Sequence, residues 1–379
     1  MNVDRAADLD RTPHGSSDDP DVLDFSANTN PLVPDGVEAV YREAFDAART
    51  YPPEPPADFR RAAAAYVDCD PDAVVPTPGG LAAIRLAVSL AVDDGDTALV
   101  PAPSFGEYAR EVRLQGGDPA FVSAESILDA DPESHALAVV CAPNNPTGTD
   151  YDPAALDRFA ARCRAADTPL LVDEAFRGFT DRPSISGTDG VIVARSLTKL
   201  FGLPGIRAGF AVATGEIGAA LRGARRAWNM SAPALATGAH CMRQAEFVRD
   251  TRERVRTERE RLRDALRTRY AVAPSNAPFL LVDVGGGETG GGGDAPRGRR
   301  GDDRTVADVV SAARDRGVAV RDATTFRGLD SHVRVAVRRP AENDRLLAAL
   351  GVDADYDDDR DAALVDRGDT PSREVDDGV

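Results

Sequence analysis

The chain has 379 residues, enough for two domains of ordinary size, and its 42% hydrophobic and 28% charged residues are typical of a globular protein. No apolar run approaches the ~20 residues that a membrane helix needs. The acidic start "MNVDRAADLDRTPHG" resembles neither a secretory signal nor a transit peptide, so we expect a cytoplasmic protein. The formal net charge of -18 would repel a phosphate backbone, which argues against nucleic acid as a partner.

Arginine supplies almost all of the positive charge. Lys and Arg number 45 together, yet Lys199 is the only lysine, and with the many acidic residues this suggests a halophilic source with GC-rich coding. The four cysteines form no C-x-x-C pair and have no histidine nearby at ligand spacing. We therefore expect free, buried thiols and no metal site.

Short apolar runs alternate with helical stretches in the middle of the chain. The expected strands are 73–77, 97–103, 136–144, 169–176, 191–197 and 207–213. Helices are expected after the first three of them, and the third helix runs from about residue 152 to 165. Continuous apolar strands between helices are typical of a parallel sheet that is covered on both faces. The pattern predicts an α/β fold with a mostly parallel, doubly wound sheet.

A highly charged helix is expected next, over residues 246–270. Five of its residues could form one apolar stripe on an otherwise solvated rod: Val248, Val255, Leu262, Leu266 and Tyr270. Beyond the helix, strand-like and helical runs alternate in a smaller α+β unit. We therefore predict a large domain over 46–245 and a small domain over 246–351, which the N-terminal segment 1–45 joins.

Two segments have compositions that do not favour a packed structure. The glycine-rich stretch 285–303 lacks the G-K-[ST] ending of a phosphate-binding loop, so we expect a flexible insertion in the small domain. Residues 352–379 are acidic and poor in apolar side chains, which predicts a disordered tail.

Ligands of open α/β sheets bind at the carboxyl ends of the strands. The residues that follow the expected strands are Gly79-Gly80, Phe105, Asn144-Asn145, Asp173, and Ser196 with Lys199. A double glycine lets the backbone turn closely into a helix whose free N–H groups bind an anion. A plain strand-to-helix turn would explain the same glycine pair.

Asp173 ends an apolar strand, where a carboxylate is costly unless it is paired. Most such aspartates are structural, but one that faces a protonated ring nitrogen would keep an electron-sink cofactor cationic. Phe105 could offer a flat face to a ring or simply belong to the core. Asn145 could donate an amide hydrogen to an oxygen, although its N-P-T-G context also favours a turn.

Lys199 is suited to forming an imine with a carbonyl compound. Its amine attacks only when neutral, and desolvation or nearby cations can lower the pKa enough for that. Arginine stays protonated and cannot form an imine, so there is a chemical reason for a lysine at this position. Because lysine is rare in the whole chain, chance could also explain a single remaining lysine. Arg207 and Ser196 flank it as candidate phosphate ligands.

These motifs together resemble a known family. The stretch "SLTKLFGLPGIRAGF" (196–210) is similar to the pyridoxal phosphate lysine signature of the class I/II, fold type I aminotransferases. "APNNPTG" (142–148) and "LVDEAF" (171–176) stand in that family's order and spacing. The resemblance covers roughly residues 14 to 350, and it implies a fold type I enzyme with a large and a small domain.

The resemblance also implies roles for single residues. Lys199 would bind pyridoxal 5'-phosphate covalently and then move protons, and Asp173 would bind the pyridine nitrogen. Asn145 would bind the ring oxygen and Phe105 would stack on the ring. The cofactor phosphate would be held by Gly80, Leu81, Ser196 and Arg207, with Tyr51 reaching it across a homodimer interface. Arg334 would bind the carboxylate of the substrate.

The chain departs from the family pattern in two places. Phe176 stands where many members have a tyrosine, so one hydrogen bond to the ring oxygen should be absent. Leu81 stands in the turn "PGGLAA" (78–83), where many members have a G-x-G-[ST]-x-E type of turn, and it cannot offer a hydroxyl to the phosphate. Backbone donors and Arg207 would have to compensate.

Two branches of the family are closest, the histidinol-phosphate aminotransferases and the threonine-phosphate decarboxylases of cobalamin synthesis. The early "HG" and "LDFSANTNPLVP" (23–34), the "DEAF" and the ending "VRVAVRRPAENDRLLAAL" resemble the decarboxylases more. "HGSS" departs from the "HGGN" of that branch and puts any contact from that loop in doubt. The resemblance implies loss of CO2 from L-threonine phosphate, with His14, Asn30 and Arg338 as candidate substrate-binding residues.

Three functions therefore remain open at this stage. The first is the phosphothreonine decarboxylase and the second is an aminotransferase that acts on histidinol phosphate or another amino acid. The third is a non-catalytic binding protein of the same fold. The third predicts a damaged set of site residues, whereas Lys199, Asp173 and Asn145 are all present. Each candidate substrate ligand also has an explanation without a function: His14 could lie in an unstructured N-terminus, Asn30 could form an Asn-Pro turn, and Arg338 could be a surface cation.

Overall fold

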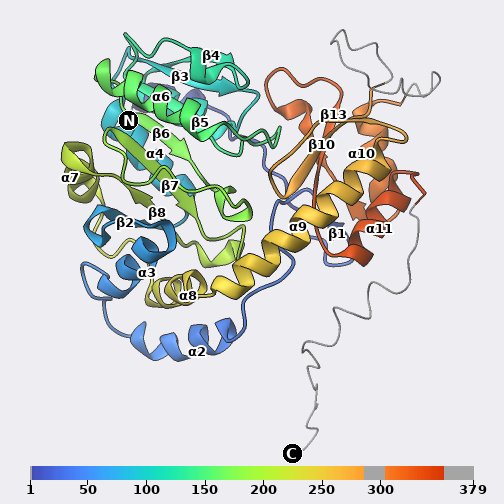
Figure 1. Cartoon of the computed structure of the whole chain (residues 1–379), viewed down its shortest axis with the longest axis horizontal. Helices are drawn as coiled ribbons and strands as arrows, with labels where there is room; N and C mark the ends of the chain where they lie inside the picture. The colour runs from blue at the N-terminus through green and yellow to red at the C-terminus, as the bar shows by residue number, and fades with distance from the viewer. Residues whose placement is uncertain (1, 286–303, 354–379) are drawn as a thin grey trace, which may run out of the picture.

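A computed structural model describes residues 2–285 and 304–353 of the chain (Figure 1). Nearly all of the predicted glycine-rich insertion (285–303) and of the predicted acidic tail (352–379) lies outside these residues. Among the helices that are described, none is both long and apolar enough to cross a membrane.

The largest sheet has seven strands in the order β2-β8-β7-β6-β5-β3-β4. Their bounds are β2 Val74–Thr77, β3 Thr97–Ala102, β4 Asp118–Ser123, β5 Leu137–Cys141, β6 Leu170–Asp173, β7 Val191–Ser196 and β8 Gly209–Val212. The pairs β4-β3, β3-β5, β5-β6 and β6-β7 are parallel, and β8 runs antiparallel to both of its neighbours. The predicted α/β fold with a mostly parallel sheet is confirmed.

The reversal of β8 decides where the only lysine lies. Ser196, the last residue of β7, is paired with Gly209, the first residue of β8. If β8 were parallel to β7, the chain would have to cross to the opposite edge of the sheet before β8 could begin. Because β8 is antiparallel, the connection between the two strands starts and ends at the carboxyl edge of β7. The connection carries Lys199, which is therefore held at the carboxyl edge of β7.

Helices cover both faces of this sheet. One face is covered by α3 (Ala57–Val67), α6 (Pro153–Ala165) and α8 (Ala232–Met242), and the other by α4 (Gly80–Ala91), α5 (Glu107–Gln115) and α7 (Gly215–Ala224). Successive residues of β6 alternate between the two cores, with Leu170 and Val172 on the first face and Leu171 on the second. Because both faces are buried, the strands read as continuous apolar runs.

The edge strand β4 was not among the strands expected from the sequence. It pairs with β3 over its whole length, and its side chains are only partly buried. Its sequence "DPAFVS" has no continuous apolar run, because an edge strand is partly exposed to water. The apolar pattern was therefore too weak to predict a strand there.

The long helix α9 (Ala245–Leu266) joins the seven-stranded part to a smaller part (Figure 1). All five residues of the predicted stripe are buried: Val248, Val255, Leu262, Leu266 and Tyr270. The helix ends four residues earlier than expected, yet the Tyr270 hydroxyl still donates to the Leu350 carbonyl over 2.9 Å.

The smaller part contains a four-stranded antiparallel sheet in the order β12-β13-β10-β9. Its elements are β9 Ala271–Val272, β10 Phe279–Asp283, β12 Arg321–Asp322, β13 His332–Ala336, and the helices α10 Val306–Arg314 and α11 Pro340–Ala349. The N-terminal segment contributes β1 (Leu23–Asp24), which pairs in parallel with β11 (Val318–Ala319). Two other N-terminal helices are α1 (Val3–Asp8) and α2 (Val37–Ala47), and α2 lies against α8.

Replacement of Phe210 by alanine should destabilise the fold strongly. Phe210 lies on β8, is fully buried and meets Phe59 of α3 edge-on, with ring centroids 6.3 Å apart. Loss of a buried phenylalanine typically costs ~3–5 kcal/mol of unfolding free energy. Chemical denaturation would measure this, with Phe121→Ala on the exposed edge strand β4 as the matched control. Equal losses in the two variants would contradict the packing described here.

Candidate active site

Three strand ends meet in a region where backbones lie unusually close. Gly209 is paired with Thr77 of β2 on one side and with Ser196 of β7 on the other. A Cβ on Gly209 would lie 2.8 Å from the Gly80 nitrogen and 2.6 Å from the Arg195 carbonyl oxygen. Only glycine fits there, so the start of α4 is held directly against the ends of β7 and β8.

Arg207 completes an anion cradle at this point. Gly79 has a φ of 92°, and a Cβ there would lie 2.6 Å from Nη2 of Arg207. The guanidinium donates to the Pro204 carbonyl at 3.1 Å, and the N-terminus of α4 has no side-chain cap. An uncapped helix start beside a cation and the Ser196 hydroxyl is suited to a phosphate. Leu81, in the first turn of α4, can offer only its backbone, as the sequence predicted.

Asp173 ends β6 and is buried beside Cys141, its partner in β5. Its carboxylate accepts hydrogen bonds from the Tyr108 hydroxyl at 2.6 Å and from the Ala175 nitrogen at 2.9 Å. Burial raises the pKa of Asp173, and the Tyr108 hydrogen bond opposes this. No salt bridge found among the described residues involves Asp173. A buried carboxylate of this kind could pair with a cation from a bound ligand.

Tyr108 is a site residue that the sequence analysis missed. It lies on α5, is fully buried, and burial followed by the neighbouring Asp173 raises its pKa well above 10. Its ring meets Phe105 edge-on, with centroids 5.6 Å apart. The tyrosine stays neutral and donates, so it fixes the Asp173 carboxylate and also supports the half-buried Phe105. The only signal was its spacing three residues after Phe105, which lies just before the start of α5 and whose carbonyl accepts from the Tyr108 nitrogen over 3.2 Å.

The pKa of Lys199 is lowered to about 8, mainly by burial and then by the positive charges of Arg334 and Arg207. The amine takes part in none of the hydrogen bonds found among the described residues. Protonation of Lys199 is therefore disfavoured, and a large fraction of the amine is neutral and nucleophilic near pH 8.

Arg334 lies on β13 and is buried close to the predicted ring ligand Asn145. It donates to the Asn145 side-chain oxygen and, over 2.8 Å, to the Ser26 carbonyl oxygen. Its Nε is buried without a hydrogen-bond partner. Burial lowers the pKa of Arg334 to about 9, and the neighbouring Arg321 adds to the effect. A bound anion would relieve both the unpaired donor and the repulsion.

Arg321 is a second residue that the sequence analysis missed. It is the cross-strand neighbour of Arg334 between β12 and β13. Both guanidinium carbons lie 5.7 Å from the centroid of the Phe326 ring. Nη2 of Arg321 donates to the Pro13 carbonyl and to the Thr325 hydroxyl, each over 2.8 Å. Like charges directly opposite in a sheet are destabilising, so an anion bound near the pair would relieve their repulsion. The stretch 318–322 reads as an element of the small domain, but β12 itself has only two residues, and its sequence does not say which residue of another strand lies opposite Arg321.

Asn28 is a third missed residue. Its side chain is buried, and its Oδ1 has no hydrogen-bond partner in the described structure. It follows Ser26, whose carbonyl accepts from Arg334, so it lies in the same segment of chain as one wall of the site. The sequence motif "SANTNP" contains two asparagines, and the sequence analysis selected the other one.

His14 and Arg338 lie near these groups. Nε2 of His14 is 3.5 Å from a carboxylate oxygen of the buried Glu107, and its ring centroid is 5.8 Å from that of Phe105. Arg338 lies over the Phe25 ring at 5.6 Å and pairs with Glu342 over 3.0 Å. Its Nε is also buried without a partner, so a plain surface cation does not describe it.

Two of the predicted ligands have surroundings unlike those of the others: Asn30 is fully hydrogen-bonded within the protein, and Tyr51 is exposed to solvent. All four hydrogen-bonding positions of the Asn30 amide are used within the protein, which gives it a structural role and leaves none for a substrate. Tyr51 is 77% exposed, and its ring packs on Trp228 with centroids 4.5 Å apart. Its hydroxyl is in none of the hydrogen bonds found among the described residues.

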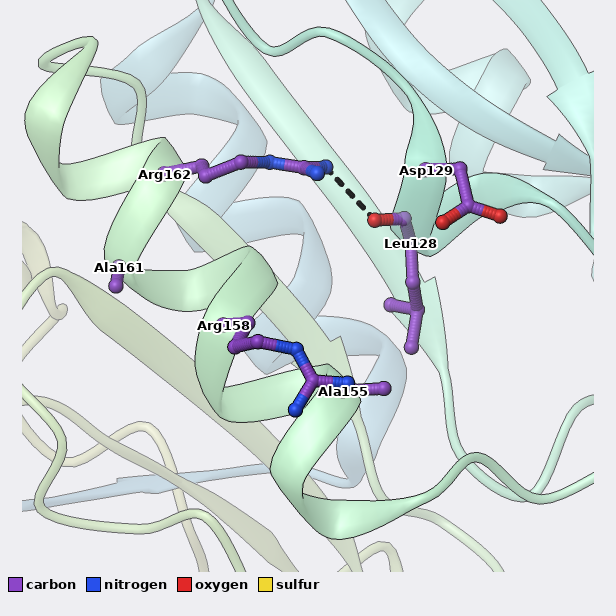
Figure 2. Close-up of a pocket in the computed structure, with 6 residues that line it drawn as sticks. All are labelled: Leu128, Asp129, Ala155, Arg158, Ala161 and Arg162. Atoms are coloured by element: carbon purple, nitrogen blue, oxygen red, sulfur yellow. Dashed lines mark hydrogen bonds between the residues drawn. The ribbon is translucent and has the colours of Figure 1, made fainter.

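A hollow lies away from these residues on the large part, between α6 and the turn at 127–129 (Figure 2). Its lining contains none of the predicted ligands. Arg162, which points across it, is already engaged by the carbonyls of Leu128 at 2.7 Å and Ala130 at 2.8 Å. This hollow therefore lacks the features that the strand-end site shows.

The residues at the strand ends fit the cofactor that the sequence resemblance implies. The glycine-lined cradle with Arg207 suits its phosphate, and the buried Asp173 suits a protonated ring nitrogen. The neutral form of Lys199 suits its aldehyde.

Comparison with known proteins gives an independent result. The profile of the family described as aminotransferase class I and II matches residues 20–350. Histidinol-phosphate aminotransferase 1 of Archaeoglobus fulgidus is 27% identical over 336 residues, which cover 87% of this chain and 98% of its own. A protein of Caldanaerobacter subterraneus subsp. tengcongensis, provisionally named threonine-phosphate decarboxylase, is 30% identical over 348 residues, with 86% and 88% covered.

A solved structure has the same fold. The histidinol-phosphate aminotransferase from Sinorhizobium meliloti in complex with pyridoxal-5'-phosphate superposes with a TM-score of 0.72 at 23% identity. The match covers 86% of this chain and 89% of that one.

The titration of Lys199 can be measured directly because it is the only lysine. Acetylation of the apoprotein should mark Lys199 half-maximally near pH 8, rising with pH as the amine loses its proton. Arg207→Gln removes a like charge, so the midpoint should rise by about one unit. Mass spectrometry would separate Lys199 from the N-terminus, and the distant Arg222→Gln is the control. A wild-type midpoint near 10.5 would contradict the lowered pKa.

Proposed function

Because the chain belongs to the class I and II aminotransferase family, whose members depend on pyridoxal phosphate, we propose that this enzyme decarboxylates L-threonine O-3-phosphate. The products would be CO2 and aminopropanol phosphate, a building block of cobalamin. The bound cofactor supplies an electron sink for the bond that breaks at Cα. Lys199 would attach it, Asp173 would keep its ring nitrogen protonated, and Lys199 would return a proton to Cα after CO2 leaves.

The observation that carries the proposal is the cross-strand pair Arg321 and Arg334. These two cations are held together over Phe326, separately from Arg207 in the glycine-lined cradle. The cradle would hold the cofactor phosphate, which leaves the unpartnered Nε of Arg334 as a donor for an anionic group of the substrate. Nη2 of Arg321 already donates to the Pro13 carbonyl and the Thr325 hydroxyl, so Arg321 would contribute mainly its charge. A phosphorylated amino acid carries two such groups, a carboxylate and a phosphate.

Two further features support decarboxylation. Phe176 is buried and meets Phe279 edge-on at 5.1 Å, so no hydroxyl reaches the ring oxygen from this position. The segment that contains Asn28 also resembles the decarboxylase branch more than the aminotransferase branch. Asn28 is a candidate substrate ligand because its buried oxygen has no partner.

The second candidate function is transamination of histidinol phosphate or of an amino acid. The relative of Archaeoglobus fulgidus carries that name. A glutamate donor would bring two carboxylates, which the same arginines could bind. The fold itself supports either reaction, so the bond that breaks must be tested directly.

Two assays separate these functions. The enzyme incubated with L-threonine phosphate should release CO2 stoichiometrically with aminopropanol phosphate, and Arg334→Met should reduce kcat/KM by at least ~100-fold because a charge-assisted contact is lost. Histidinol phosphate with 2-oxoglutarate should give no glutamate. Formation of glutamate without CO2 would instead establish the aminotransferase. Borohydride reduction followed by mass spectrometry should find the cofactor on Lys199 in either case.

We also propose that the enzyme is a homodimer. In the part of the chain that the structure describes, most of the exposed large apolar side chains lie in the stretch 32–51 and at Trp228: Leu32, Val33, Tyr41, Phe45, Tyr51 and Trp228. Phe45 on α2 is 71% exposed. An exposed apolar patch of this kind is typical of a protein interface. Burial of Tyr51 there would let its hydroxyl reach the cofactor phosphate of the other subunit.

The dimer can be tested with one charged substitution. Phe45→Arg should give monomers in analytical ultracentrifugation, because a charge would be buried without a partner. Phe121→Arg, which changes an exposed phenylalanine on the edge strand β4, should leave the mass unchanged. A monomeric wild-type enzyme with full activity would contradict the proposal.

A further inference from the structure

We infer that Asn30 is a positioning residue that holds the backbone of the loop carrying Lys199, residues 197–208, in its working place. This inference rests on the proposed function, because it takes the amine of Lys199 as the reacting group. Sequence reasoning had offered Asn30 as a substrate ligand, and the contacts of its side chain indicate a different task.

Asn30 holds two successive carbonyl groups of the loop. Its peptide N–H donates to the Lys199 carbonyl over 2.9 Å, and its side-chain Nδ2 donates to the Leu200 carbonyl over 2.8 Å. Asn30 is buried, so both bonds are shielded from water. Within residues 2–285 and 304–353, the amine of Lys199 has no hydrogen-bond or salt-bridge partner, and its position therefore depends on how its backbone is held.

The Asn30 amide is itself fixed by three further contacts. Nδ2 also donates to the Thr251 hydroxyl at 3.2 Å, and Oδ1 accepts from Nη2 of Arg254 at 2.7 Å. Both partners lie on α9. Oδ1 accepts a second bond from the Leu32 nitrogen at 3.1 Å. The amide has no rotational freedom left, which is what a positioning group requires.

Gly202 gives independent support for the docking of the loop. Its φ is 67°, and a Cβ there would lie 2.4 Å from the Leu32 carbonyl oxygen and 2.8 Å from that of Asn30. The loop therefore rests directly on the backbone of residues 30–32, and a side chain at position 202 would lift it away.

The same contacts connect the loop to the arginines of the substrate site. Arg254 uses its other terminal nitrogen to donate to the Arg338 carbonyl over 2.9 Å. Arg338 follows β13, the strand that carries Arg334. The chain of contacts from Leu200 through Asn30 and Arg254 to Arg338 thus sets the distance between the reacting amine and the anion-binding arginines.

The test replaces Asn30 by alanine in the full-length chain. Without the amide, the loop should move toward water, so the acetylation midpoint of Lys199 in the apoprotein should rise by about one pH unit. In the holoenzyme, kcat should fall by about 100-fold while KM changes little, since the amine is misplaced rather than the substrate. Gly202→Ala, in which Asn30 is intact, should also raise the acetylation midpoint of Lys199. If the Asn30→Ala variant does not fold, Gly202→Ala serves as the test variant.

The matched control is Thr168→Val. The buried Thr168 hydroxyl donates to the carbonyls of Pro132 at 2.9 Å and His135 at 3.0 Å, before the start of β6. Its loss should lower the unfolding temperature and leave both the midpoint and kcat unchanged. The inference is overturned if Asn30→Ala behaves like this control. The acetylation arm needs no cofactor, so it decides the role of Asn30 even if the wild-type enzyme fails the CO2 assay.

Discussion

The antiparallel insertion of β8 between β2 and β7 is the constraint on which the whole site depends. It brings Thr77, Gly209 and Ser196 into one register, and the missing side chain of Gly209 lets the start of α4 approach the ends of both strands. The same reversal makes the connection after β7 return to its own edge. A phosphate cradle and a reactive amine are therefore consequences of a single strand direction.

The charges around Lys199 and Asp173 determine which protonation states these two residues favour. Burial, Arg334 and Arg207 disfavour the charged form of Lys199, and the same excess of positive charge attracts anionic ligands. At the end of β6, Asp173 is buried with a tyrosine as its hydrogen-bond donor instead of a cation. Among the described residues, neither the Asp173 carboxylate nor the cations Lys199, Arg207 and Arg334 form a salt bridge, although the charge of Asp24 acts on both Lys199 and Arg334. Each imbalance is costly in the free protein, and a zwitterionic cofactor with an anionic substrate would remove both.

The sequence predicted those candidate ligands that stand at the ends of strands or just after them. Asp173, Ser196 and Lys199 could be found because their strands are continuous apolar runs with a clear end. Tyr108 was missed because it lies inside a helix, where an aromatic residue is ordinarily core. Arg321 was missed because its importance comes from its pairing with Arg334 across a two-residue strand. Asn30 and Asn28 could not be told apart, since they are two positions apart in one turn and differ only in which atoms surround them.

By itself the sequence determined the α/β class, six of the seven strands of the large sheet and the identity of the lysine that forms the imine in the proposed function, because these depend on local apolar patterns and on side-chain chemistry. Only the tertiary structure decided the direction of β8, the pairing of the two arginines and the task of Asn30. These features depend on contacts between segments that lie up to 224 positions apart, as for Asn30 and Arg254, and no local pattern encodes such a distance.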